Sequence, residues 1–145
     1  TGAPRTAGIR AATPVTLVRI DQAAFASLMQ ATAVSRSVWD AFAQRSFDNH
    51  VRSLKQYWHL DRDERLNWVA DREQLALAEG DVSELPGDMT YIFVVTGSVR
   101  LVGSEADLKA PALVELPANR TVSARSSARV ALLPSLENVR STRVA

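Results

Sequence analysis

The chain has 145 residues, a formal net charge of +1 and no cysteine, and 46% of its residues are hydrophobic. This length and apolar fraction are typical of one compact domain, or of one domain with part of another, and they exclude a disordered chain. The absence of cysteine excludes disulfides, thiolate catalysis and cysteine-ligated zinc. No apolar run reaches the roughly 20 residues that a membrane helix needs, so we expect a cytoplasmic chain without a membrane span.

The charge changes sign along the chain. Residues 1–60 carry seven Lys and Arg against three acids, residues 61–90 three Arg against nine acids, and residues 91–145 seven Lys and Arg against four acids. None of these segments has the strongly basic composition of a nucleic-acid-binding domain, so we expect no nucleic-acid partner. The alternation is typical of solvated faces, and a contact between the acidic middle and a basic flank remains open.

The first half of the chain predicts two short strands and then helices. Thr6–Arg10 and Pro14–Ile20 are rich in β-branched side chains, and Pro14–Ile20 is apolar on both faces, as in a buried strand. Asp21 is a predicted helix N-cap. Apolar residues then recur at helical spacing and predict a long amphipathic helix from about 33 to 58, bent near Ser46, whose stripe serves as core or as a dimer seam. They are Val34, Val38, Trp39, Phe42, Phe47, Val51, Leu54 and Trp58.

The second half changes to a period of two. Asp61 and Glu64 have the spacing of a capping box and predict a short helix that buries Trp68, and all three Trp are expected in the core. Turns are predicted at Gly87–Asp88 and Gly97–Ser98. Strands are predicted at Tyr91–Thr96, Val99–Val102, Ala112–Leu116, Thr121–Ala124 and Val130–Leu133. The predicted fold class is α+β: an antiparallel, jelly-roll-like β-roll with flanking helices and a long connecting helix.

No arrangement of residues predicts catalysis or a metal site. The sequence has no Ser/His/Asp order, no glycine-rich phosphate loop and no paired buried carboxylates, so we expect that the chain is not an enzyme. His59, Asp61 and Asp63 have a spacing that metal ligands can take, but Asp61 is better explained as a helix cap. We therefore expect no bound metal.

The glycines and strands of Leu75–Val102 resemble the first half of a cyclic-nucleotide-binding domain. The elements that carry the resemblance are Gly80–Asp81, Gly87–Asp88, Tyr91–Val95 and Gly97–Val99. The stretch from Pro4 to Asp21 resembles the same family at a later point, the end of its phosphate-binding cassette and its last two strands. The resemblance implies that Arg5, with Thr6 and Ala7, binds the phosphate of cAMP or cGMP in a longer parent protein.

The C-terminal part of the chain repeats the N-terminal part. Without gaps, RTAGIRAATPVTLVR from Arg5 aligns with RTVSARSSARVALLP from Arg120, which predicts tandem copies of one domain type. Residues 1–58 would be the end of a truncated copy with a linker helix, and residues 59–145 a degenerate second copy. Arg120 and Thr121 are its weaker ligand candidates, because Ala110–Pro111 stands where the family has Gly-Glu.

The function implied by the resemblance is regulatory and non-catalytic. A cyclic nucleotide bound in the parent protein would move the helices, and residues 33–58 would pass the movement to an effector domain outside this chain. The alternative is a structural interaction or dimerisation module that binds no nucleotide. We expect no cofactor in the chain itself. The unpaired N-terminal strands are expected either to join the roll of residues 75–133 within the chain or to be exchanged between copies in a homo-oligomer.

Overall fold

The computed structural model describes residues 10–30 and 32–137 of the chain. The chain forms two compact units, Thr1–Ser35 and Arg36–Ala145. The sequence predicted a boundary between residues 58 and 59, where one copy of the domain type would end and the next begin. This boundary does not refer to compact units, and it stays a prediction. In the described part, no helix is both long enough and apolar enough to cross a membrane.

The first unit contains an extended segment followed by the short helix α1 (Gln22–Leu28). The Asp21 carboxylate accepts a hydrogen bond from the Ala24 backbone N–H at 2.8 Å, which confirms the predicted N-cap. The prediction of a buried strand at Pro14–Ile20 is wrong, since the segment has no strand structure and Leu17 is 81% exposed. A strand needs neighbouring strands for its backbone hydrogen bonds, and no described segment pairs with this one. The other predicted strand, Thr6–Arg10, lies outside the described residues except for its last residue.

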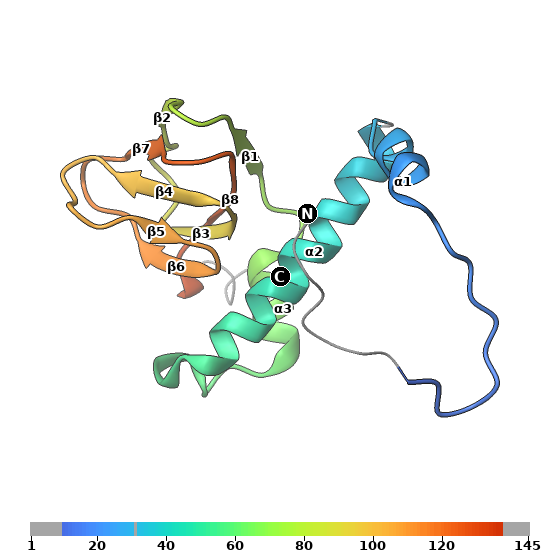
Figure 1. Ribbon diagram of the computed structural model, residues 1–145. Coiled ribbons are helices and arrows are strands. Elements are labelled where there is room, and N and C mark those ends of the chain that lie inside the picture. Colours follow the sequence, from blue (N-terminus) through green and yellow to red (C-terminus); the bar gives the residue numbers. More distant parts are fainter. Residues whose placement is uncertain (1–9, 31, 138–145) are drawn as a thin grey trace. The chain divides into compact units, whose positions relative to one another are not determined.

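The second unit is built around strands (Figure 1). Their bounds are β1 (Gln74–Leu77), β2 (Val82–Glu84), β3 (Tyr91–Thr96), β4 (Ser98–Leu101), β5 (Leu108–Lys109), β6 (Ala112–Glu115), β7 (Thr121–Ala124) and β8 (Ala128–Leu133). They form two four-stranded antiparallel sheets, one in the order β1-β8-β3-β6 and the other in the order β2-β7-β4-β5. Apolar side chains from both sheets meet between them. The fold is therefore an α+β antiparallel roll with flanking helices, as predicted.

The long helix α2 (Thr32–Ser53) runs without interruption through Ser46, where the sequence predicted a bend. It ends five residues before the predicted position 58, because Leu54 is extended with φ −97° and ψ 112°. A short 3₁₀ turn, η1 (Lys55–Tyr57), follows. The indole N–H of Trp58 donates to the Arg52 carbonyl at 3.0 Å and so satisfies a carbonyl of the last helical turn. Trp58 is 65% exposed, so its predicted place in the core is wrong.

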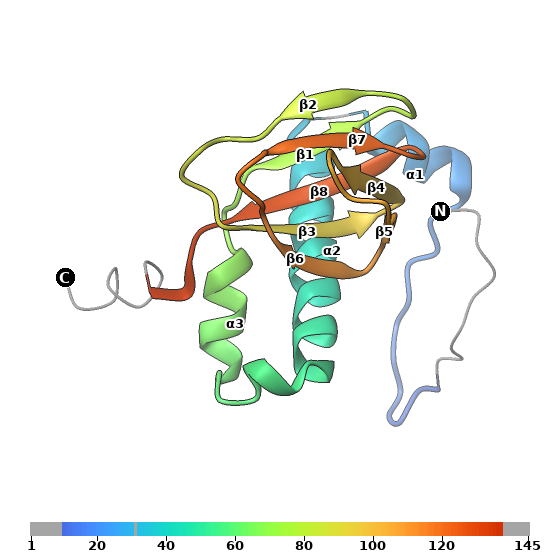
Figure 2. The ribbon, with the colours of Figure 1, turned by 90° about the vertical axis from the view of Figure 1, so that its left-hand side faces the viewer.

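The helices α2 and α3 (Arg62–Val69) cover the outer face of the β1-β8-β3-β6 sheet (Figure 2). Phe47 and Val51 of α2 are fully buried there, but Phe42 of the same predicted stripe is 42% exposed. Asp61 and Glu64 form the predicted capping box at the start of α3. An ion pair between the Arg65 Nε and an Asp48 carboxylate oxygen, 2.6 Å apart, joins α3 to α2. Trp68 is fully buried, as predicted, whereas Trp39 is only half-buried.

The turn at Gly97 is a corner between the two sheets rather than a hairpin. β3 pairs with β6 and β8, whereas β4 pairs with β5 and β7, so the chain changes sheet at this residue. Gly97 has φ +73°, and a Cβ on it would lie 2.2 Å from the Ser127 carbonyl oxygen and 2.8 Å from the Ala128 Cα. Only glycine fits this corner, because the obstructing atoms belong to the backbone.

We predict that Gly97→Ala lowers the free energy of unfolding by about 2–4 kcal/mol, because it adds a backbone clash to an unfavourable positive φ. Gly103→Ala is the matched control: Gly103 also has a positive φ, +93°, but a Cβ there would meet no atom within 4 Å. The control should lose only about 1 kcal/mol. Urea unfolding measures both losses, and equal losses would contradict the close approach at Gly97.

Candidate functional site

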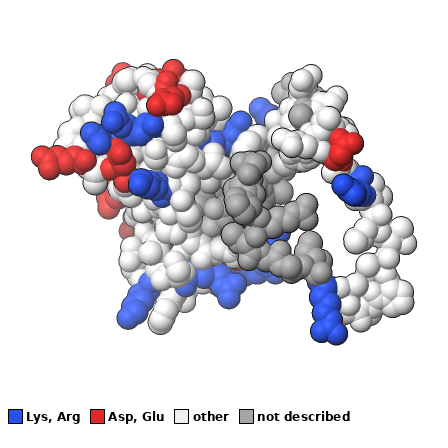
Figure 3. All heavy atoms as spheres, viewed as in Figure 1, with Lys and Arg blue, Asp and Glu red and all other residues white. Residues whose placement is uncertain are grey.

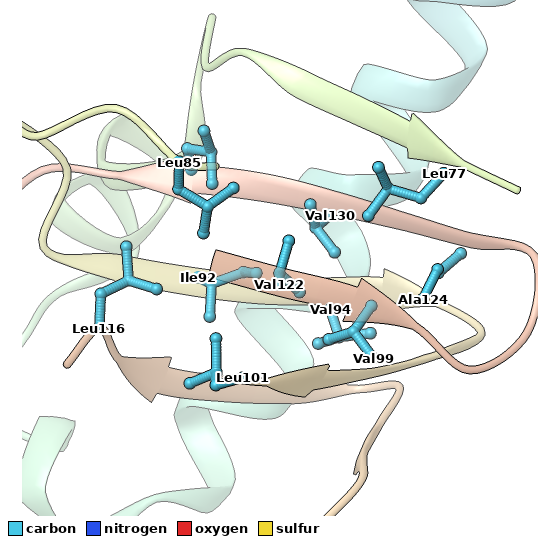
Figure 4. Close-up of a cluster of buried hydrophobic side chains, with 12 residues drawn as sticks. Leu77, Leu85, Ile92, Val94, Val99, Leu101, Leu116, Val122, Ala124 and Val130 are labelled. Atoms are coloured by element: carbon cyan, nitrogen blue, oxygen red, sulfur yellow. The ribbon is translucent and has the colours of Figure 1, made fainter. Parts of the chain in front are cut away.

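The space between the two sheets of the roll is filled by twelve buried side chains, all of them apolar (Figure 4). They are Leu77, Leu85, Ile92, Val94, Val99, Leu101, Leu116, Val122, Ala124, Ala128, Val130 and Leu132. Figure 4 shows the side chains of β3, β4 and β7 directed toward one another. In residues 10–30 and 32–137, no polar or charged residue is buried. The interior therefore offers a phosphate no hydrogen-bond donor from a buried side chain.

Arg120, one of the two weaker second-copy candidates, is held by main-chain carbonyls. Its Nη1 donates to the carbonyl oxygen of Met89 and, at 3.3 Å, to that of Pro86. Its own carbonyl accepts a hydrogen bond from the Leu85 N–H at 2.8 Å. Arg120 thus joins the connection between β2 and β3 to the start of β7, which is a structural role for this guanidinium.

Thr121 follows Arg120 as the first residue of β7, where its carbonyl accepts from the Val102 N–H at 2.8 Å. The connection from β6 to β7 consists of residues 116–120 and contains no helix. Ala110–Pro111, which the sequence aligned with the family's Gly-Glu, lies instead between β5 and β6, with the Ala110 N–H on the Gly97 carbonyl at 3.0 Å. Arg120 and Thr121 therefore lie together at the start of β7, and Ala110–Pro111 lies on a different connection.

Arg5, Thr6 and Ala7, the first-copy candidates, lie outside the described residues. Their assignment as phosphate ligands stays a prediction from the resemblance. Around Asp61, the structure accounts for the carboxylate through the capping box. No group of three or more His, Asp or Glu in the described part is arranged to hold a metal ion.

A polar cluster that the sequence analysis missed lies where α2 meets β1 and β8. The Arg129 guanidinium carbon lies 4.3 Å from the centre of the Trp39 ring, a cation–π geometry. The Gln74 Nε2 donates to the Asp40 carboxylate at 2.7 Å. Burial lowers the pKa of Arg129, and the nearby Asp40 carboxylate acts in the opposite direction. These residues come from three distant segments, and no local spacing could have indicated the cluster.

Charged side chains of both signs share the surface of the roll (Figure 3). On the β2-β7-β4-β5 sheet, one Asp107 oxygen lies 2.8 Å from the Arg100 Nε and 3.6 Å from the Arg125 Nε. The three side chains are 32% to 47% exposed, so water screens these pairs and each contributes little stability. The arrangement is an ion-pair network on a solvated sheet face.

No family model and no curated protein matches the chain. Among solved structures, it is similar to a cyclic nucleotide-binding-like protein from Brucella abortus, with 10% identity, a TM-score of 0.48 and coverage of 68% of this chain and 97% of that chain. It is also similar to the sensor domain of the transcriptional regulator DNR from Pseudomonas aeruginosa, with 13% identity, a TM-score of 0.48 and coverage of 70% and 79%. A third similar structure is the regulatory domain of Toxoplasma gondii PKA with cAMP, with 16% identity, a TM-score of 0.46 and coverage of 77% and 51%. These likenesses concern the fold alone.

We predict that Arg120→Ala lowers the free energy of unfolding by about 1–2 kcal/mol, because the carbonyls of Pro86 and Met89 lose a donor. Arg125→Ala is the matched control, since the Arg125 side chain is 47% exposed and, among the described residues, makes only the ion pair with Asp107 at 3.6 Å. The control should lose less than about 0.5 kcal/mol. Urea unfolding checks both values, and an Arg120→Ala variant as stable as the unaltered chain would contradict the structural role.

Proposed function

We propose that the roll of Arg36–Ala145 is a non-catalytic regulatory module that acts through contacts with protein and does not itself bind a cyclic nucleotide. The observation that carries the proposal is the interior of the roll, which twelve apolar side chains fill. Five of them are 0% exposed: Ile92, Val94, Val99, Val122 and Val130. A ligand between the sheets would have to displace side chains that already pack there.

The electrostatics of the roll support the same proposal. A cyclic phosphate is negatively charged, and burying it without charged partners costs several kcal/mol. Arginine is the side chain best suited to such a partner. Here Arg120 already donates to the carbonyls of Pro86 and Met89, and turning it toward a ligand would leave those oxygens without this donor.

For the longer parent protein, we propose that a cyclic nucleotide is sensed by the N-terminal cassette of Arg5, Thr6 and Ala7. The helix α2 is the proposed relay, because it begins in the first unit and ends in the second. Ala43, Phe47 and Val51 of its C-terminal part belong to the buried apolar cluster between the helices and the β1-β8-β3-β6 sheet. A movement of α2 would therefore act on the packing of the roll. The second candidate is an interaction module in which neither copy senses a nucleotide, and the filled interior favours it equally.

We predict that calorimetric titration of the 145-residue chain with cAMP or cGMP gives no saturable heat up to about 1 mM, and that the ligand raises the Tm by less than about 1 °C. Saturable binding that is lost in Arg120→Ala but kept in Arg125→Ala would overturn the proposal for the roll. Binding that is lost only in Arg5→Ala would contradict the prediction for this chain, but it would assign the nucleotide to the N-terminal cassette and leave the proposal for the roll intact.

In the longer parent protein, the same titration separates the two candidate functions. Saturable heat that Arg5→Ala abolishes supports the sensor, while its absence at about 1 mM ligand supports the interaction module. Arg10→Ala is the control for a general loss of positive charge near the cassette.

A further inference from the structure

The extended segment Pro14–Ile20 exposes a row of large apolar side chains. Val15 is 56%, Leu17 81%, Val18 87% and Ile20 52% exposed. Burying side chains of this kind yields about 1.5–3 kcal/mol each. Four such side chains exposed within six residues therefore indicate that the segment lacks the structure against which it would pack.

The internal repeat identifies the structure that this segment matches. The alignment of Arg5 with Arg120 places Val15 on Val130 and Leu17 on Leu132, both identical in type, and Val18 on Leu133. In β8 these three positions are 0%, 1% and 0% exposed. A sequence of this kind is thus fully buried in one copy and exposed in the other.

The two faces of β8 show what kind of partner is missing. Val130 and Leu132 point into the interior between the sheets, while Ala131 and Leu133 pack in the buried apolar cluster between the helices and the β1-β8-β3-β6 sheet. Strands at the edges of the sheets, such as β2 and β6, are more exposed than β8. A strand with the pattern of β8 therefore fits the middle of a sheet and not an edge.

The segments that follow the two strands repeat as well. The same alignment pairs Asp21 with Leu136 and Gln22 with Glu137. Helix α1 begins at Gln22, and Leu136 and Glu137 are helical. The repeat thus extends beyond the strand to a helix that starts within one residue of the same place.

We propose that Pro14–Ile20 is the last strand of another roll of the same type, and that the strands which flank it precede Thr1 in a longer polypeptide. In the described roll, β8 pairs with β1 and β3, and both precede it in the chain. A second copy of this chain has no vacancy for the segment, because its own β8 already lies between β1 and β3. The proposal concerns the first unit and does not depend on nucleotide binding.

The first test uses the 145-residue chain and two substitutions at equivalent positions. Leu17→Asp should leave the Tm unchanged within about 1 °C, because the segment is not part of the roll. Leu132→Asp should abolish cooperative unfolding, because it buries a charge in the interior. A lower Tm in Leu17→Asp would overturn the proposal in favour of pairing within this chain. A dimer in which residues 15–20 are protected from amide exchange would overturn it in favour of pairing with a second copy.

The second test uses the polypeptide extended on its N-terminal side by the length of a roll. Residues 15–20 should now be protected from amide exchange, and Leu17→Asp should lower a Tm by about 5 °C or more. Ser37→Asp, on an exposed position of α2, is the control for an added charge. Exchange at residues 15–20 as fast as in the 145-residue chain would overturn the proposal.

Discussion

The ring of Trp68 connects the helices to the roll, and the second unit depends on this contact. It lies edge-to-face against Phe47 of α2 at 5.4 Å, Tyr57 of η1 at 5.5 Å and Tyr91 of β3 at 5.2 Å. Its indole N–H donates at 2.9 Å to the carbonyl of Pro134, directly after β8. One side chain thus fixes two helical segments, the central strand β3 and the exit of the chain from the sheet. Aromatic pairs in this geometry add to the stability that burial provides.

The sequence predicted the elements whose causes are local. The Asp61–Glu64 capping box depends only on residues three positions apart. The strands Tyr91–Thr96 and Thr121–Ala124 are recognised from their local apolar pattern, although their pairing involves distant strands. The predictions that failed concern positions where distant parts of the chain decide. Trp58 has the spacing of a core residue, yet its indole is used to satisfy the end of α2.

The same distinction applies to the candidate site. The assignment of Arg120 as a phosphate ligand rests on a resemblance in the local sequence and stays a prediction, whereas its hydrogen-bond partners, 31 and 34 positions earlier in the chain, could be found only in the structure. Whether a strand-like sequence such as Pro14–Ile20 is buried depends equally on strands elsewhere. The sequence could therefore indicate which residues suit a function, whereas the filling of the interior became visible only in the folded roll.

The continuity of α2 restricts how the length of the chain can vary. The helix has 22 residues, and each residue of an α-helix rotates the next by about 100° and advances it by about 1.5 Å. Inserting a single residue between Asp40 and Ala43 would therefore rotate Trp39 and Asp40 by about 100° around the helix axis, away from Arg129 and Gln74, while Phe47 and Val51 stayed in the core. Insertions of about seven residues nearly restore the phase. The contacts of Trp39 and Asp40 with the sheet therefore depend on the helical phase between these residues and Phe47, rather than on the number of residues between them.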